Sequence, residues 1–370
     1  MILGVSAEQE ELRASVRRFL ADRAPMSRVR GLMDDGETDW AVWEQAGSQL
    51  GLQGLAIPES YGGAGFSFAE QAVVLEEFGA ALYGGPYLAS AVLAATALLA
   101  SPDEGARSGL LPDIASGQTV ATLAFTEDGG SWDPAAIRLS AVKDGEAWRL
   151  DGHKSFVLDG ATAGLILVVA TTDAGLSLFA VEGDADGLSR AALPALDQTR
   201  QLARLEFAGV TGRLIGSPGD SAAALDRALD VAAVALAAEQ LGGAQRALDM
   251  AVEYAKTRRQ FDRPIGSFQA IKHRCADLLL EVESLRSAVG YAAAAVAEDS
   301  AEIPVLASLV KAYASETYFH VAAENIQIHG GIGFTWEHDA HLYFKRAKAS
   351  ELFLGDGAYH RERLANRIGL

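Results

Sequence analysis

The stretch EQLGGAQRALDMAVEYAKTRRQFDRPIGSFQAIKH, from Glu239 to His273, indicates two helices joined by a short break. In its first half, apolar residues recur three or four positions apart, which places them on one face of a helix. They are Leu241, Ala244, Leu248, Ala251 and Ala255. Arg258 and Arg259 follow, at a helix end where cations oppose the macrodipole. Gly266 belongs to the break, and a second helix is expected near Ser267. On spacing alone, the ordinary interpretation is a helical hairpin with two solvated arginines.

The string YAKTRRQFDRPIGSFQ within this stretch resembles the flavin-binding signature of the acyl-CoA dehydrogenase family. The signature is a tyrosine, an arginine, a phenylalanine-glycine pair and a glutamine eight residues later. Its counterparts are Tyr254, Arg258, Phe261 and Gln269, with Asp262 in place of the usual glycine. The resemblance implies that Arg258 and Gln269 contact the pyrophosphate and neighbouring polar groups of an FAD in the adjacent subunit, and that Phe261 packs near the cofactor. Arginine suits this role because its planar, permanently charged fork bonds two phosphate oxygens at once.

A second glycine-rich segment follows a long helix expected over residues 303–328, with Pro304 in its first turn. The segment reads QIHGGIGF and, taken alone, is a glycine-rich helix C-cap. It resembles the second flavin signature of the same family, which implies that Gln327, Gly330 and Gly331 lie along the adenosine-diphosphate half of a neighbour's FAD. We interpret His329 as a local polar contact, since nothing nearby suggests a carboxylate that would orient it as a base.

The middle of the chain has a different pattern of apolar and turn-forming residues. From about Thr119 to Gly216, short apolar runs alternate with Gly/Asp turns, which predicts a small antiparallel sheet domain. The expected strands are 120–125, 147–150, 165–171, 176–181 and 205–207.

Two segments of this sheet domain also resemble the family. LAFTEDGGS, from Leu123 to Ser131, is similar to a loop that hydrogen-bonds the flavin, which assigns that role to the hydroxyls of Thr126 and Ser131. The loop is one residue shorter than usual, and Asp128 stands where proline is common. In LDGHKSFVLDGATA, Phe156 fills the position of an aromatic that packs on the flavin. Leu158 occupies the following hydroxyl position and cannot donate a hydrogen bond.

The resemblance spans roughly Ser6 to Gly369 and implies an α+β protein with the acyl-CoA dehydrogenase fold. The expected domains are an N-terminal helical domain (1–118), a middle antiparallel β-domain (119–216) and a C-terminal four-helix bundle (217–370). A chain of 370 residues is long enough for two or three domains. Ser6 with Gln9 predicts a capping box at the first helix. Later in the N-terminal domain, the loop YGGAG (residues 61–65) is interpreted as a structural turn rather than a phosphate-binding loop.

Composition narrows the function further. The chain carries 31 basic and 49 acidic residues, a net charge of −18, which argues against nucleic-acid binding. Cys275 is the only cysteine, so intrachain disulfides and thiolate zinc sites are excluded, and no metal is expected. No secretory signal is visible, and the most apolar stretch, Tyr87 to Ala100, is too short to span a bilayer. We therefore expect a cytoplasmic protein with no membrane partner.

The catalytic base is the point at which the sequence departs from the family. Dehydrogenation in the family requires a glutamate that removes the α-proton of the substrate. One family position is a Tyr-Glu-Gly-Thr turn, and alignment on the basic run 345–348 places Leu354 there. The other lies ten residues before Gly242, at Ala232, and its partner arginine falls on Ala233. Neither leucine nor alanine can accept a proton.

Two carboxylates remain near these positions. Glu239 lies seven residues after Ala232, two helical turns away on the same face and about 10 Å along the axis. It is a candidate for a relocated base, and equally for a buried ion pair or a subunit contact. Asp356 lies two residues after Leu354, but its side chain is short, and it is the weaker candidate.

These observations leave three functional hypotheses. The first is an FAD-dependent acyl-CoA dehydrogenase that acts on an acyl-CoA thioester, reduces its flavin and passes the electrons to an electron-transfer acceptor protein. The second is a catalytically silent subunit that completes the FAD site of a partner chain. The third is a flavin oxidase or monooxygenase of the same fold. The resemblance implies a homo-oligomer or, as in some actinobacterial members of the family that pair a chain bearing the glutamate with one lacking it, an α2β2 hetero-oligomer.

Overall fold

The structure is a computed structural model that describes residues 6–35 and 37–370. The chain folds into two compact units. The helical unit comprises the chain up to Gly31, Phe68–Tyr83 and Ala233–Leu370, and the sheet unit comprises Leu32–Ser67 and Gly84–Ala232. Helix α7 (Ala222–Thr257) is continuous across the boundary between Ala232 and Ala233. None of the helices in the described residues is long and apolar enough to cross a membrane.

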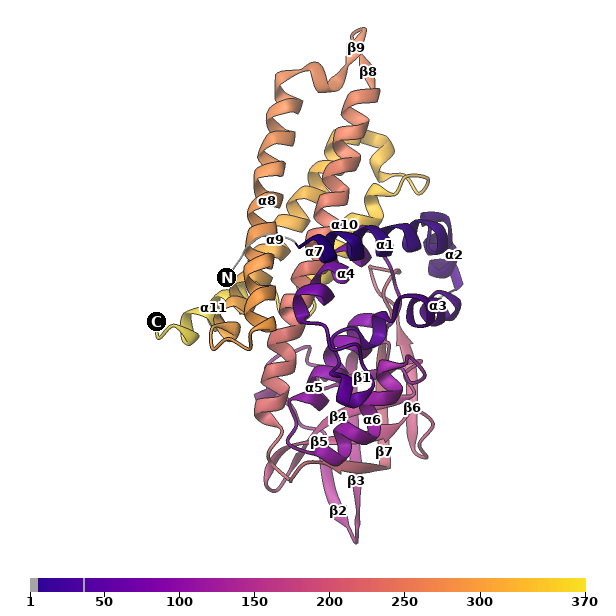
Figure 1. The fold of residues 1–370 in the computed structure, drawn as a ribbon, viewed down its shortest axis with the longest axis vertical. Helices are drawn as coiled ribbons and strands as arrows, with labels where there is room; N and C mark the ends of the chain where they lie inside the picture. Colours follow the sequence, from indigo (N-terminus) through magenta and orange to yellow (C-terminus); the bar gives the residue numbers. More distant parts are fainter. Residues whose placement is uncertain (1–5, 36) are drawn as a thin grey trace. The chain divides into compact units, whose positions relative to one another are not determined.

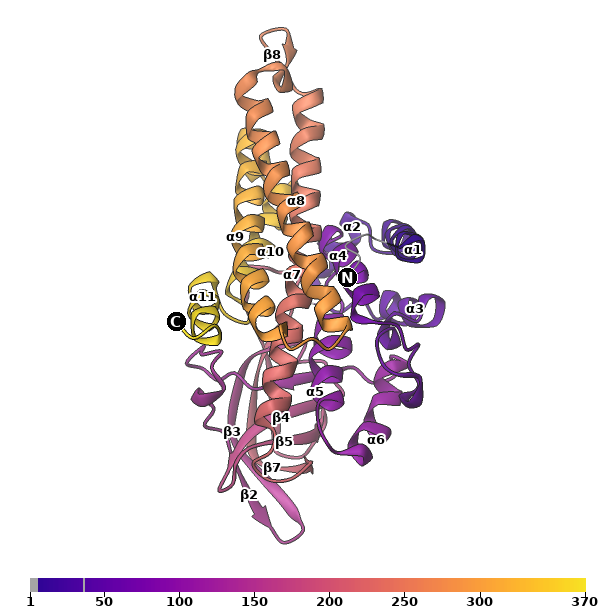
Figure 2. The same cartoon turned by 60° about the vertical axis from the view of Figure 1, so that its left-hand side comes forward.

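The helical unit is built on the later part of α7, with the following long helices beside it (Figures 1 and 2). Its other principal helices are α1 (Ala7–Arg23), α4 (Phe68–Ala80), α8 (Gln269–Ala297), α9 (Ile303–His329), α10 (Ala340–Leu352) and α11 (Gly357–Arg367). The capping box predicted at the start of α1 is confirmed, because the side chains of Ser6 and Gln9 each accept a hydrogen bond from the other's backbone N–H. The predicted helix at 303–328 is confirmed as α9, with Pro304 in its first turn.

Helices α4 and α7 cross with their backbones in contact. A Cβ atom at Gly79 of α4 would lie 1.9 Å from the carbonyl oxygen of Glu239. A Cβ atom at Gly242 of α7 would lie 1.7 Å from the carbonyl oxygen of Glu76. No side chain fits at either position, so glycine is required for this close approach. The crossing therefore fixes the position of Glu239 relative to α4.

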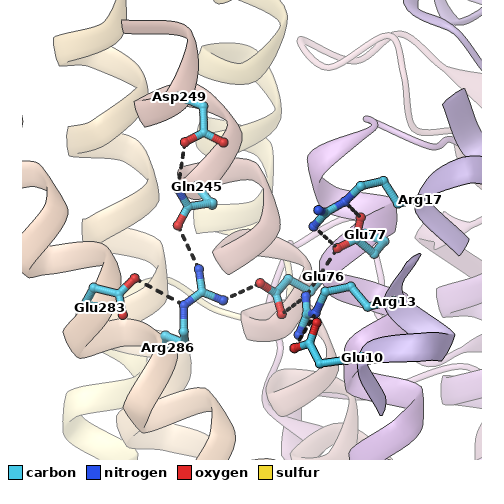
Figure 3. Close-up of polar contacts among 9 residues, drawn as sticks. All are labelled: Glu10, Arg13, Arg17, Glu76, Glu77, Gln245, Asp249, Glu283 and Arg286. Carbon is cyan, nitrogen blue, oxygen red and sulfur yellow. Dashed lines mark hydrogen bonds and ion pairs between the residues drawn. The ribbon is translucent and has the colours of Figure 1, made fainter. Parts of the chain in front are cut away.

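A network of ion pairs surrounds the crossing (Figure 3). Arg286 of α8 contacts Glu76 of α4 and donates a hydrogen bond to Gln245 of α7 at 2.8 Å. On the other side, Glu77 accepts hydrogen bonds from Arg13 and Arg17 of α1. The network therefore joins four helices through charged side chains.

The break predicted after α7 is a two-stranded hairpin. The helix ends at Thr257, strands β8 (Arg259–Gln260) and β9 (Arg263–Pro264) pair, and a 3-10 turn (Ile265–Ser267) leads into α8. Arg259 therefore lies in a strand and not at a helix end. The sequence did not reveal this hairpin because each of its strands has only two residues, too few for a periodic pattern.

The sheet unit holds seven strands: β1 (Ala121–Ala124), β2 (Ser140–Asp144), β3 (Ala147–Leu158), β4 (Leu165–Thr172), β5 (Gly175–Glu182), β6 (Leu188–Leu193) and β7 (Leu202–Ile215). Strand β4 pairs with β2 and β5, and the pairings β2–β3, β3–β7 and β7–β5 complete a closed ring. The antiparallel sheet predicted from the sequence is wrong in one respect, since β4 pairs with both β1 and β2 in parallel. Alternation of apolar runs and turns cannot distinguish the two directions when nonconsecutive strands pair.

The helices of the sheet unit are α3 (Trp40–Leu50), a π-helix (Leu88–Ala94) that continues as α5 (Ala95–Leu99), and α6 (Glu104–Ala115), while α2 (Met26–Asp35) begins in the helical unit. In the YGGAG loop, a Cβ atom at Gly63 would lie 2.0 Å from the carbonyl oxygen of Ile57. This close packing accounts for the loop glycine without a ligand, in agreement with the interpretation as a structural turn.

Candidate functional site

In the helical unit, the candidate site begins at the hairpin tip between α7 and α8. Phe261 and Asp262 form the two-residue turn between β8 and β9, and both have left-handed backbones, with φ of 50° and 61°. Positive φ at both central residues is the signature of the turn that fits the twist of a hairpin. Aspartate tolerates this conformation better than most residues, so Asp262 can replace the usual glycine. Phe261 is 85% exposed and is not part of a hydrophobic core.

The hairpin packs against the C-terminal end of α9. Ala251 and Ala255 of α7 are buried together with Ile328 of α9. Beside them, the ring of Tyr254 stacks on His329 with 4.3 Å between ring centroids. The structure therefore brings the two segments that resemble flavin signatures together, although more than fifty residues separate them in the chain.

The polar groups of both segments are free to meet a ligand. The side chains of Arg258, Gln269 and Gln327 are exposed and make no hydrogen bond or ion pair within the described residues. Gly330 has φ of 64°, and a Cβ atom at Gly330 or Gly331 would have no atom within 4 Å. A guanidinium, two amides and open backbone on one end of the unit fit the diphosphate and adenosine of a dinucleotide.

His329 makes the local contact predicted from the sequence. It is buried, and its Nδ1–H donates a hydrogen bond to the carbonyl of Asn325 at 2.8 Å. Burial lowers the pKa of His329. The contacts described for this ring are to Tyr254, His338 and that carbonyl, and none is to a carboxylate.

In the sheet unit, the candidate site centres on the loop after β1. Thr126 is 3% exposed, and within the described residues its hydroxyl has no hydrogen-bond partner. A buried hydroxyl left unbonded costs on the order of 1–3 kcal/mol, which a ligand atom would recover. Ser131 is exposed, and its hydroxyl accepts a hydrogen bond from the backbone N–H of Asp133 at 3.2 Å. The unbonded hydroxyl of Thr126 fits the flavin contact that the resemblance implies.

Phe156 lies in a β-bulge that redirects its side chain. The register of β3 against β7 shifts between Lys154 and Val157, and Phe156 within that shift has φ of 58°. A left-handed backbone is uncommon for an aromatic residue, and such strain is concentrated at functional sites. The Phe156 ring reaches the glycine loop, since a Cβ atom at Gly130 would lie 3.8 Å from its Cε2. Leu158 is buried, and its backbone carbonyl accepts a hydrogen bond from the Thr122 hydroxyl at 2.5 Å.

Charged residues under this loop escaped the sequence analysis. Lys154 is fully buried, and its ammonium donates hydrogen bonds to the Phe125 carbonyl at 3.0 Å and to Glu127 at 2.9 Å. Burial lowers the pKa of Lys154 to about 8. Hydrogen bonds from Arg204, and then from Ser155, lower the pKa of Asp128 to about 2. One signal in the sequence could have revealed this pair. Lys154 occupies a position of β3 at which alternation of inward and outward side chains predicts an apolar residue.

The positions to which the resemblance assigns the family base are apolar in the structure. Leu354 is buried with a left-handed backbone, φ of 63°, and Ala232 and Ala233 are buried on α7. Glu239 is buried, with one carboxylate oxygen 2.6 Å from a guanidinium nitrogen of Arg346. This buried ion pair is one of the roles that the sequence left open for Glu239. Asp356 caps α11 by accepting a hydrogen bond from the backbone N–H of Tyr359 at 2.8 Å.

Comparison with known proteins defines the class. Residues 6–118, 122–210 and 222–369 match, in order, the N-terminal, middle and C-terminal domains of acyl-CoA dehydrogenases. The chain belongs to the acyl-CoA dehydrogenase family, as the resemblance predicted. The α+β fold class is likewise confirmed, and FAD is the cofactor that the family indicates.

Individual relatives cover nearly the whole chain. The acyl-CoA dehydrogenase IpdE2 of Mycobacterium tuberculosis is 37% identical over 348 residues, which cover 94% of this chain and 93% of the relative. A solved variant of the Tcur3481–Tcur3483 steroid ACAD is 35% identical, with a TM-score of 0.89 and coverage of 99% and 98%. The ChsE4–ChsE5 complex from Mycobacterium tuberculosis is 31% identical, with a TM-score of 0.91 and coverage of 100% and 99%.

Proposed function

We propose that this chain is a subunit of a hetero-oligomeric, FAD-dependent acyl-CoA dehydrogenase, in which its hairpin tip completes the FAD site of a partner chain. One contrast carries the proposal. The groups that would reach a neighbour's cofactor, Arg258, Gln269 and Gln327, are present and unpaired within the described residues. The resemblance assigns the position of the common family base to Leu354, which is buried and cannot accept a proton.

The relatives support a pairing of unlike chains. The ChsE4–ChsE5 complex contains two different chains, and Tcur3481–Tcur3483 is also named as a pair. The reaction of the assembly would be α,β-dehydrogenation of an acyl-CoA thioester, with the base supplied by the partner and the electrons passed on to an acceptor protein. Because one of these solved relatives is a steroid ACAD, an acyl-CoA with a steroid-derived acyl group is the first substrate class to test.

The residues of this chain would bind and orient the cofactor. FAD, when bound, accepts the hydride that leaves the substrate. Arg258 neutralises phosphate charge, and the exposed backbone at Gly330 and Gly331 lets the diphosphate approach closely. In the sheet unit, Thr126 would offer its free hydroxyl and Phe156 a ring face to a flavin bound within this chain, distinct from the partner's FAD at the hairpin tip. Leu354 and Ala232 are buried apolar residues, and neither can move a proton.

The test compares the chain alone with the chain co-expressed with an acyl-CoA dehydrogenase-like chain that bears the family glutamate. We expect flavin absorbance and acyl-CoA-dependent bleaching only in the co-expressed assembly. In that assembly, Arg258→Gln should weaken FAD binding at least tenfold, because a phosphate contact is lost. Lys256→Gln is the matched control, since Lys256 is an exposed cation on the last turn of α7.

Other results would favour the remaining hypotheses. Bleaching by the lone chain that disappears in Glu239→Gln, with the unfolding midpoint unchanged, would show a relocated base and overturn the subunit proposal. Oxygen consumption with a substrate that is not a CoA thioester would support a flavin oxidase or monooxygenase. FAD binding that is indifferent to Arg258→Gln would remove the proposed role of the hairpin tip.

A further inference from the structure

Four consecutive residues of the loop after β1 are tied, one by one, to the strand beneath them. The ammonium of Lys154 holds the residues on either side of Thr126, through the Phe125 carbonyl at 3.0 Å and the Glu127 carboxylate at 2.9 Å. Thr126 itself is held through its carbonyl, which accepts the backbone N–H of Ser155 at 2.8 Å. The hydroxyl of Thr126 is the group that these contacts leave unbonded.

The fourth residue, Asp128, is held by a separate set of groups. Its carboxylate accepts hydrogen bonds from the Ser155 hydroxyl and, at 3.1 Å, from Arg204 of β7, and it lies 3.1 Å from His153. Its side chain is half exposed, whereas Lys154 is fully buried. Beyond Asp128 the loop turns at Gly130, which lies against the ring of Phe156.

Glu127 extends the first anchor to the other end of the loop. One of its carboxylate oxygens accepts the backbone N–H groups of Arg138 and Leu139, at 2.8 Å and 2.7 Å, and also the Lys154 ammonium. A single buried ammonium therefore fixes both the start of the loop and the segment that leads into β2. In the described part of the chain, the ammonium donates hydrogen bonds to the Phe125 carbonyl and the Glu127 carboxylate alone.

We propose that Lys154 and Glu127 are positioning residues that hold the loop from Phe125 to Ser131 in its flavin-binding conformation before any flavin arrives, with Asp128 as a second, outer anchor. The inference rests on the proposed flavin site for the role of Thr126, but the pre-formed loop is a property of the protein without cofactor. A loop ordered in advance loses less conformational entropy on binding, so its anchors add to cofactor affinity without touching the cofactor.

The experiment replaces Lys154 by methionine, which is of similar length and cannot donate a hydrogen bond. In flavin-free protein, we expect amide hydrogen exchange at Ser155, Arg138 and Leu139 to become at least tenfold faster, because their acceptors lie in the loop. In the assembled protein, we expect FAD affinity to fall at least tenfold. Lys143→Met, on exposed β2 of the same sheet, is the control and should change neither measurement.

Each outcome decides the inference. Exchange at wild-type rates in Lys154→Met, or equal effects in Lys143→Met, would overturn it. If Lys154→Met does not fold, Glu127→Gln takes its place, since glutamine keeps an oxygen for the two backbone N–H groups and loses only the charge. Exchange at those amides should then rise at least threefold, and no rise would overturn the inference. Faster exchange in a protein that never binds FAD would uphold the anchored loop while refuting the proposed function.

Discussion

Glu239 and Arg346 form a buried ion pair whose removal distinguishes structure from catalysis. Replacing Glu239 by glutamine removes one carboxylate of a buried ion pair with Arg346, and breaking a buried pair destabilises by about 3–5 kcal/mol. We therefore expect a lower denaturation midpoint in Glu239→Gln. If Glu239 were instead a base, the same variant would lose substrate-dependent flavin bleaching with its unfolding midpoint unchanged.

A double variant provides the control for this prediction. Glu239→Leu combined with Arg346→Met removes both charges together, and replacing a whole buried pair with apolar side chains is often neutral. The double variant should be more stable than Glu239→Gln. Equal loss in both would contradict the ion-pair interpretation.

At the scale of single residues, the sequence predicted the motifs whose residues lie close together in the chain. It did not predict ion pairs between residues that are far apart in the chain. The flavin segments around Arg258 and Gly330 were recognisable as strings, and the structure brings them together. The Arg346 partner of Glu239 lies 107 residues away, and the Lys154–Glu127 pair spans 27 residues. No periodicity within one element reveals such contacts. The assignment of flavin-binding roles to the named residues stays a prediction.

At the scale of elements, Glu77 is a buried carboxylate that helps to attach α1 to α4. Glu77 has a side chain that is 4% exposed and accepts hydrogen bonds from both Arg13 and Arg17. Glu77→Gln should lower the free energy of unfolding by about 2 kcal/mol, because Arg13 and Arg17 lose a charged acceptor while Arg13 keeps its 2.8 Å contact with Glu76. Hydrogen exchange across α1 should rise in the same variant, as measured by mass spectrometry.

Glu10→Gln is the matched control for this prediction. Glu10 also pairs with Arg13, at 3.6 Å, but its side chain is 58% exposed. Pairs that are open to solvent contribute about 0–1 kcal/mol. A comparable loss of stability in both variants would show that the network around Arg13 is not organised by Glu77.

Elements with a buried face were predictable, and elements with exposed faces were not. In α8, Leu278, Val282, Leu285 and Val289 recur three or four positions apart in the sequence, and all four are buried. Strands β2 and β6 were missed because nearly all of their residues are exposed or half-buried. Strands β3 and β7 extend well beyond their predicted apolar cores, since hydrogen bonding between strands continues where the side chains are polar.

At the scale of the whole molecule, acid should destabilise the fold through a buried histidine. His360 is buried, and its Nε2–H donates a hydrogen bond to the Leu354 carbonyl at 3.0 Å. Burial, with Lys311 nearby, lowers the pKa of His360 to about 3. Below pH 6.5 the unfolded chain binds a proton that the folded chain does not, so stability falls by about 1.4 kcal/mol per pH unit from pH 6.5 towards pH 3.

The comparison with His360→Gln isolates this effect from the titrating carboxylates. Glutamine can still donate a hydrogen bond to the Leu354 carbonyl but does not titrate. Chemical denaturation at several pH values should give a shallower decline below pH 6.5 in the variant. Parallel declines in the two proteins would mean that His360 is protonated in the folded state at these pH values.

The division of the chain also bears on how this protein can be taken apart. Three domains were predicted from the sequence, and that prediction stays open, whereas the structure groups the chain into two units of interleaved segments. Because the segments of the two units alternate along the chain, no single cut in the polypeptide releases either unit intact. Truncation at the turn near Gly216 would separate α1 and α4 from the rest of the helical unit. It would also remove the first part of α7 from the sheet unit. We therefore expect the two units to fold only when they are expressed as one polypeptide.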